Sequence, residues 1–153
     1  MSDFFQTGPE LTNTYRLDPL LQSLLKRKLP EKYLNEVEED LTRFGERLVG
    51  DVLAFSDDAE ANHPTLISHD PWGNRIDEIE TSLGWKELDK VSAEEGIVAI
   101  GYERKFGEFS RLIQFAKIYL YHPSSAYYTC PLAMTDGAAK LIESFGDTSL
   151  KEG

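Results

Sequence analysis

Seven large apolar residues recur every three or four positions between residues 34 and 55, and this pattern constrains the fold more than any other feature. Such spacing places the apolar side chains on one face of an α-helix. The opposite face is charged, with Glu39 and Arg43 among its residues, and is expected to be solvated. The pattern predicts one long amphipathic helix from Pro30 to Phe55, whose apolar stripe consists of Leu34, Val37, Leu41, Phe44, Leu48, Val52 and Phe55.

Four more helices are predicted, at residues 18–29, 83–95, 107–122 and 123–146. Asp18 and Pro19 are typical of a helix start, because Asp caps free backbone N–H groups and Pro tolerates the first helical position. The helix at residues 107–122 is apolar almost all round, so we expect it to be central. Carboxylates are abundant, but all are expected to be exposed, and no acid–base pair stands out.

The segment between the second and third predicted helices has the features of two short strands, at residues 65–68 and 75–81. The sequence DPWGN between them is typical of a turn. The predicted fold class is therefore all-α, with about five helices and a short irregular β-hairpin or extended cross-over between helices two and three. Residues 1–16 are expected to form an extended arm, and residues 17–153 the helical domain.

The last predicted helix is poor in bulky side chains. Its small residues are Ala126, Ala133, Gly137, Ala138 and Ala139. We expect something to pack closely against them, and the sequence leaves open whether this is another helix or a ligand. Pro131 predicts a kink or an offset helix start, because proline lacks the N–H that a helix interior requires. Cys130 lies in apolar surroundings and is expected to be an inert, buried thiol.

Composition excludes several functions. The net charge of −11 argues against nucleic-acid binding, because phosphates would be repelled. The single cysteine excludes an internal disulfide and a cysteine-rich zinc site. No apolar run approaches the roughly 18 residues that span a membrane, and the N-terminus resembles no targeting peptide. The default expectation is a cytoplasmic protein, with mitochondrial and peroxisomal locations left open. The common phosphate-binding, nucleophile and zinc motifs are absent.

The sequence from residue 101 to residue 147 resembles the end of the N-terminal helical domain of acyl-CoA dehydrogenases, and especially the AidB-type branch of that family. In the family, a helix with small residues begins with a Pro-x-x-Met-Thr-like pattern, ends at a glycine and is followed by a lysine-bearing segment. The matching residues are Pro131, Met134, Thr135, Gly146 and Lys151. Residues 74–77 (NRID), followed by Trp85, also resemble the AidB-type cross-over. The resemblance covers roughly residues 15–153 and is most specific from about residue 72.

The resemblance implies the first part of a three-part flavoprotein, followed in the family by a middle β domain and a C-terminal helical bundle. FAD lies between those two parts, and a glutamate of the bundle is the catalytic base. Acyl-CoA and the two missing domains are thus the implied partners, and the complete protein is expected to form a homo-oligomer. The resemblance carries over no catalytic residue, and FAD is not expected to bind this chain tightly by itself.

The resemblance does imply that one wall of the acyl cavity is formed by residues of this chain, at Ala133, Met134 and Gly137. Small residues at Ala133 and Gly137 would leave a deep cavity that suits a medium or long acyl chain. The implied function is the N-terminal part of an FAD-dependent enzyme that dehydrogenates acyl-CoA thioesters, inactive as this chain alone. The alternative is a non-enzymatic helical module that binds a partner or a lipid.

Overall fold

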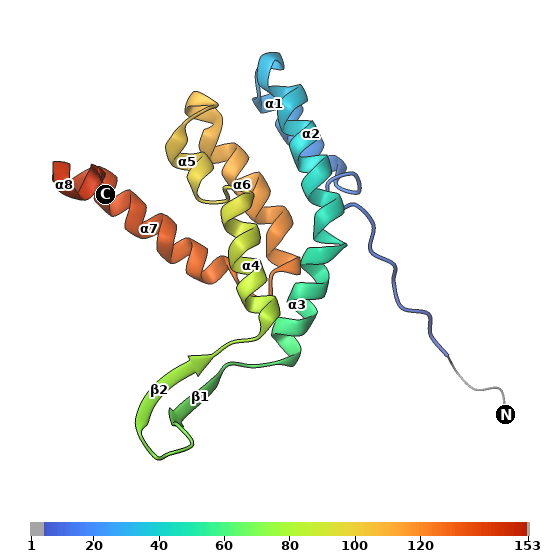
Figure 1. The fold of residues 1–153 in the computed structure, drawn as a ribbon. Helices are drawn as coiled ribbons and strands as arrows, with labels where there is room; N and C mark the ends of the chain where they lie inside the picture. Colours follow the sequence, from blue (N-terminus) through green and yellow to red (C-terminus); the bar gives the residue numbers. More distant parts are fainter. Residues whose placement is uncertain (1–4, 153) are drawn as a thin grey trace.

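The computed structural model of the chain describes residues 5–152 and confirms the all-α class with one β-hairpin (Figure 1). More helices are present than expected, because short helices occupy segments predicted as connectors. The elements are α1 (Pro19–Lys28), α2 (Glu31–Leu48), α3 (Asp51–Ala61), β1 (Thr65–His69), β2 (Arg75–Glu80), α4 (Leu83–Glu94), α5 (Ala99–Glu103), α6 (Ser110–Tyr121), α7 (Thr129–Phe145) and α8 (Thr148–Glu152), with 3₁₀ turns at Gly107–Phe109 and His122–Ser124.

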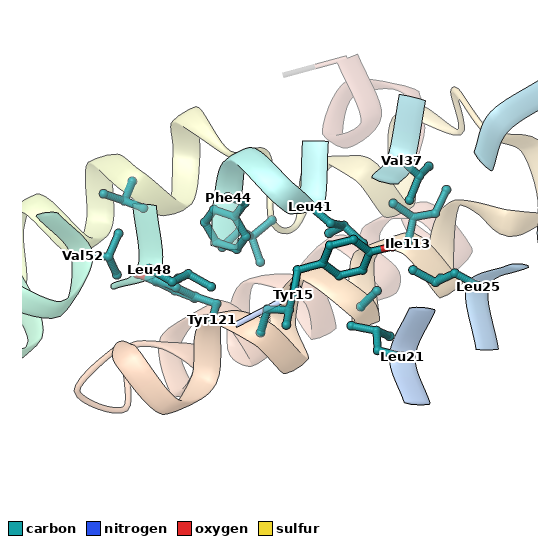
Figure 2. Close-up of a cluster of buried hydrophobic side chains, with 14 of the residues drawn as sticks. Tyr15, Leu21, Leu25, Val37, Leu41, Phe44, Leu48, Val52, Ile113 and Tyr121 are labelled. Atoms are coloured by element: carbon teal, nitrogen blue, oxygen red, sulfur yellow. The ribbon is translucent and has the colours of Figure 1, made fainter. Parts of the chain in front are cut away.

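The core forms around the apolar stripe of α2, which faces α1 and α6 (Figure 2). Phe44 of α2 is fully buried and lies with its ring 6.0 Å from that of Tyr121, which is also fully buried. The Tyr121 hydroxyl donates a hydrogen bond to the backbone oxygen of Leu88 and accepts one from Ser92, both at 3.1 Å. Burying a side chain of this size stabilises the fold by roughly 1.5–3 kcal/mol, and the satisfied hydroxyl avoids a desolvation penalty.

The predicted continuous helix from Pro30 to Phe55 is wrong, because the structure divides it into α2 and α3. The break lies at Val49 and Gly50, whose backbone angles are not helical. Glycine weakens a helix interior because it has more conformational freedom to lose than any other residue. The apolar stripe nevertheless continues across the break, since Leu48 and Val52 are both fully buried.

Helix α6 was expected to be central because its surface is apolar almost all round, but it packs into the core on one face only. Ile113 and Leu120 are buried in the core, whereas Phe115 and Tyr119 are each 58% exposed. The two exposed rings lie beside α1, where they line a shallow apolar hollow of about 290 Å³. The sequence pattern could not show which part of the wide stripe reaches the core.

The hairpin prediction is confirmed in preference to an extended cross-over. Strands β1 and β2 pair in antiparallel fashion, with Leu66 opposite Ile79 and an irregularity between Ile67 and His69. The hairpin projects from the bundle at the junction of α3 and α4 (Figure 1), and all of β2 is exposed. Its base is tied to the bundle by a hydrogen bond from the Gly84 N–H to Asp58 Oδ2, at 2.6 Å.

The segment before α1 is anchored near its end. Residues 5–12 have no regular structure and are exposed, whereas Asn13 and Tyr15 are buried. The Asn13 side chain donates a hydrogen bond to the backbone oxygen of Thr42, at 2.8 Å, and lies against Gly45. A Cβ atom at Gly45 would overlap with Asn13, so this close approach to α2 requires glycine. Residues 1–4 of the predicted arm lie outside the described residues.

Candidate functional site

Helix α7, which contains all three predicted site residues, stands apart from the bundle (Figure 1). None of its residues is buried. A Cβ atom built on Gly137 would meet nothing within 4 Å. The small residues of α7 are therefore not packed against another helix of the described chain, although the sequence had left such a crossing open.

Apart from Leu132, which packs partly buried against the core, the face of α7 that is turned toward the bundle contacts it through polar groups. The Tyr102 hydroxyl of α5 donates a hydrogen bond to the backbone oxygen of Asp136, at 2.6 Å. Arg111 of α6 donates from Nη1 to Asp136 Oδ1, at 2.7 Å. Burial alone would raise the pKa of Asp136, but the hydrogen bond from Arg111 outweighs it and lowers the pKa below its ordinary value. Farther along the same face, Arg104 pairs with Glu143.

The opposite face of α7 is apolar and points to solvent. Met134, Leu141 and Phe145 are 72%, 61% and 82% exposed. Their spacing of seven and four residues puts them on one side of the helix, together with Gly137. We call these four residues the α7 stripe. Beyond its first turn, where Leu132 packs on the core, α7 thus makes polar contacts to its own bundle and leaves an apolar surface exposed.

The three predicted cavity residues lie together on this outer side of α7. Met134 and Gly137 belong to the α7 stripe, Ala133 lies at its margin, and all three are exposed. Cys130, one turn before Met134, is exposed, so the expected buried thiol is wrong. The reason is the reversed orientation of α7, which turns the apolar surroundings of this cysteine outward.

Pro131 produces an offset helix start and no kink. Helix α7 begins at Thr129, so Pro131 occupies its first turn. The backbone N–H groups of a first turn have no partner within the helix, so the missing donor of proline costs nothing there. Of the two predicted outcomes, a kink or an offset helix start, the offset start is observed. Met134 and Gly137 lie farther along the same helix.

A strained turn directs α7 away from the bundle. Ala126 and Tyr127 have φ values of +42° and +62°, in the left-handed region that residues other than glycine rarely adopt. The conformation is held on both sides, because the Ala126 N–H donates to Ser56 Oγ at 3.0 Å and Tyr128 packs on Trp85 with ring centroids 4.9 Å apart. Such strain persists only where the surroundings over-determine it, and it clusters at functional sites.

A buried charge cluster lies between α2, α6 and the end of α4, where only exposed carboxylates had been expected. Glu95 accepts hydrogen bonds from Arg43 at 2.6 and 2.8 Å, and from Arg47 and Lys117 at 3.0 Å. Burial alone would raise the pKa of Glu95, but these hydrogen bonds outweigh it and lower the pKa to about 2. Glu95 is therefore ionised at neutral pH and holds the three helices together, and it is unsuited to proton transfer.

The hollows of the described surface carry mixed charges. Five of them have volumes of about 290 to 490 Å³, and each is lined by at least one carboxylate, while basic side chains such as Lys105 and Lys117 line the same hollow as Glu36. Within residues 5–152, the structure contains no group of three His, Cys, Asp or Glu residues arranged for a metal ion. The same part of the chain has no helix that combines the length and the apolar character of a membrane span.

Comparisons with known proteins agree with the fold and with the resemblance in sequence. Residues 7–151 match the family described as the adaptive response protein AidB N-terminal domain. The chain is 43% identical over 142 residues to acyl-CoA dehydrogenase family member 11 of Caenorhabditis elegans, a match that covers 92% of the chain and 23% of that relative. The chain thus spans about a quarter of the length of this curated relative.

Two solved structures share the fold. The apo form of Bd2924 superposes with a TM-score of 0.94 and 51% identity, over 98% of this chain and 30% of that one. Caenorhabditis elegans ACDH-11, solved in complex with C11-CoA, superposes with a TM-score of 0.90 and 41% identity. That match covers 98% of this chain and 26% of ACDH-11.

Proposed function

The chain belongs to the AidB N-terminal domain family of the acyl-CoA dehydrogenases, and on this premise we propose that α7 forms a wall of an acyl-CoA cavity. In this proposal the chain is the N-terminal helical part of a flavoprotein that dehydrogenates acyl-CoA thioesters. The residues of α7 exclude water from the acyl chain and limit the depth of the cavity. The FAD, and the residues that break the C–H bonds, belong to parts of the protein other than those described here.

The observation that carries the proposal is the outward direction of the α7 stripe. A surface helix of a single domain normally turns its apolar face inward, and α7 does the reverse. Met134 is flexible, Gly137 adds no bulk, and Leu141 and Phe145 extend the apolar surface along the helix. Each methylene of an acyl chain that is buried against such a surface is stabilised by roughly 0.8 kcal/mol.

The relatives support acyl-CoA as the ligand class. The ACDH-11 structure contains C11-CoA, and its fold superposes on nearly the whole of this chain. Each matched structure is also more than three times as long as the part that this chain covers. The additional length is consistent with a cavity whose remaining walls come from other domains.

The alternative function is a non-enzymatic helical module that binds a partner protein or a lipid through the same stripe. This function is supported by the exposure of Met134, Leu141 and Phe145, an apolar surface that fits a partner or a lipid as well as an acyl chain. A flavoprotein absorbs near 450 nm, so the spectrum of the protein purified from cells with its full reading frame separates the two functions. A colourless preparation that does not bind acyl-CoA favours the module.

The acyl wall is tested in a chimera in which this chain replaces the matching segment of ACDH-11. Gly137→Leu adds bulk to the stripe, and overpacking of about 1–3 kcal/mol corresponds to a loss of affinity of roughly 5- to 150-fold. We expect this loss for C11-CoA and little change for butyryl-CoA, because only the longer chain reaches the stripe. Isothermal titration measures both ligands.

A matched control for this test is Gly8→Leu, which adds the same side chain at an exposed position with no neighbour within 4 Å. It should leave both affinities unchanged. If Gly137→Leu weakens the two ligands equally, the substitution has only destabilised the helix, and the acyl wall is wrong.

A further inference from the structure

We propose that Tyr102, Arg111 and Asp136 are positioning residues that hold α7 at its angle to the bundle and thereby set the depth of the acyl cavity. The depth-setting role rests on the proposed function above, whereas the control of the α7 angle does not. Neither Tyr102 nor Arg111 lies on the stripe. Both act on the acyl chain only through the position of α7.

Three groups of contacts connect α7 to the bundle, and they differ in strength. At the start of the helix, Tyr128 packs on Trp85 and donates a hydrogen bond to Asp89, at 2.7 Å, and Leu132 packs partly buried against the core. Near the far end, Arg104 and Glu143 form an exposed pair, and pairs of that kind contribute little. The angle of α7 therefore depends on the contacts of Asp136 between these ends.

The contacts of Asp136 are preorganised. Arg111 lies with its guanidinium carbon 4.4 Å from the centre of the Tyr102 ring. Its Nη1 atom also donates to Gln114 Oε1, at 2.7 Å, and Gln114 is fully buried. A Cβ atom at Gly101 would overlap with the ends of the Gln114 and Arg111 side chains, so glycine leaves the space in which these two side chains meet. The side chain of Arg111 is thus held in one place before α7 reaches it.

Because α7 is long, a small displacement at Asp136 produces a larger displacement at the end of the α7 stripe. Asp136 lies seven residues beyond the start of α7 at Thr129, or about 10 Å along the helix, and Phe145 lies about 24 Å along it. A rotation that swings α7 about the strained turn at Ala126 and Tyr127 therefore moves Phe145 about twice as far as Asp136. Gly137 is adjacent to Asp136 and moves with it.

The angle of α7 is measured in this chain by the distance between two nitroxide labels. The labels replace Ser144 on α7 and Glu39 on α2, both exposed, in a chain whose native thiol is removed by Cys130→Ser. We expect Arg111→Met to shift and widen the distance distribution. The removal of a charge-assisted hydrogen bond should also speed hydrogen exchange of the α7 amides by about tenfold or more, because the released helix frays.

Arg75→Met is the matched control, since Arg75 also pairs with an aspartate, Asp77 at 2.6 Å, but on the hairpin. It should leave the distance unchanged. Tyr102→Phe removes one hydroxyl and provides a second test if Arg111→Met does not fold. An unchanged distance in a folded Arg111→Met or Tyr102→Phe chain overturns the proposal.

The depth-setting role is measured in the ACDH-11 chimera with Arg111→Met. We expect the ratio of affinities for C11-CoA and butyryl-CoA to change by about tenfold, with Arg75→Met unchanged. A merely structural role would weaken both ligands alike. If the label distance changes while the ratio stays constant, the control of the α7 angle stands and the depth-setting role is overturned, whereas the acyl wall itself is decided by Gly137→Leu. The two failures are therefore distinguishable.

Discussion

Lys117 and Glu95 form an ion pair inside the bundle, with Lys117 Nζ 3.0 Å from Glu95 Oε2 and only 4% and 3% of their side chains exposed. Lys117 also pairs with Asp40 and donates to the backbone oxygen of Glu95. Every charge of this cluster has an opposite partner. A buried ion pair of this kind adds little net stability compared with apolar packing, but the loss of Glu95 leaves the buried Lys117 with the partly exposed Asp40 as its carboxylate partner.

The first prediction is that Glu95→Leu destabilises the chain by about 3–5 kcal/mol, since Lys117 would remain buried and Arg43 and Arg47 would lose their shared acceptor. Urea unfolding followed by circular dichroism measures the change. The control is Glu94→Leu, which removes an exposed partner of Arg47 and should cost at most about 1 kcal/mol. Equal losses in the two variants would contradict the structural role of the cluster.

The second prediction concerns pH. The pKa of Glu95 falls from 4.5 to about 2 on folding, so the folded state favours the ionised form. This contribution, about 3 kcal/mol, is complete above pH 4.5 and is lost as pH falls toward 2. Urea unfolding between pH 2 and pH 6 should show this loss in the native chain. Glu95→Gln should show a shallower dependence, and parallel curves would refute the assignment.

The third prediction compares two helical glycines. A Cβ atom at Gly84 would overlap with the backbone oxygen of Phe55, so Gly84→Ala should separate α3 from α4 and cost about 1–3 kcal/mol. Gly137 has open space around it, and Gly137→Ala should stabilise the chain by about 0.5–1 kcal/mol because alanine favours a helix. Thermal unfolding measures both changes, and a stabilising Gly84→Ala would show that this helix contact is looser than described.

The fourth prediction is that the chain alone associates or binds a hydrophobic dye, because the α7 stripe is a contiguous exposed apolar surface. Light scattering and dye fluorescence measure this behaviour. Replacing Leu141 and Phe145 by serine should reduce both signals, whereas Leu11→Ser, at another exposed leucine, should leave them unchanged. A native chain that is monomeric and does not bind the dye would argue against an interface at α7.

The fifth prediction is that the chain alone does not bind FAD with micromolar or higher affinity, since the proposed function assigns the flavin to other parts of the protein. Flavin fluorescence during a titration measures binding. A stoichiometric complex would contradict the prediction and would show that residues of this chain hold the flavin.

The helices were predictable from sequence where local signals determine them. The spacing of apolar residues predicts α2, and Asp18 caps α1 as expected, with its Oδ1 accepting from the Leu21 N–H at 2.7 Å. The position of Pro131 also restricted where α7 could begin. These features depend on residues within a few turns of one another, and periodicity and capping describe such interactions well.

Features that depend on distant partners were not predictable. Glu95 looks like any surface carboxylate until helix packing brings it to Arg43 and Lys117, which lie 52 and 22 residues away. The left-handed turn at Ala126 and Tyr127 contains no glycine from which it could have been predicted. For α7, the sequence identified the candidate residues, but an amphipathic pattern alone does not determine which face meets the bundle.

The position of the hairpin makes the domain modular. The chain leaves the bundle after α3 and returns at α4, where the contact between Asp58 and Gly84 joins the two helix ends. No residue from 63 to 81 is buried, so the core does not depend on the length or composition of this segment. The hairpin can therefore be shortened to a turn, or exchanged for a foreign insert, while the helices keep the packing that supports α7.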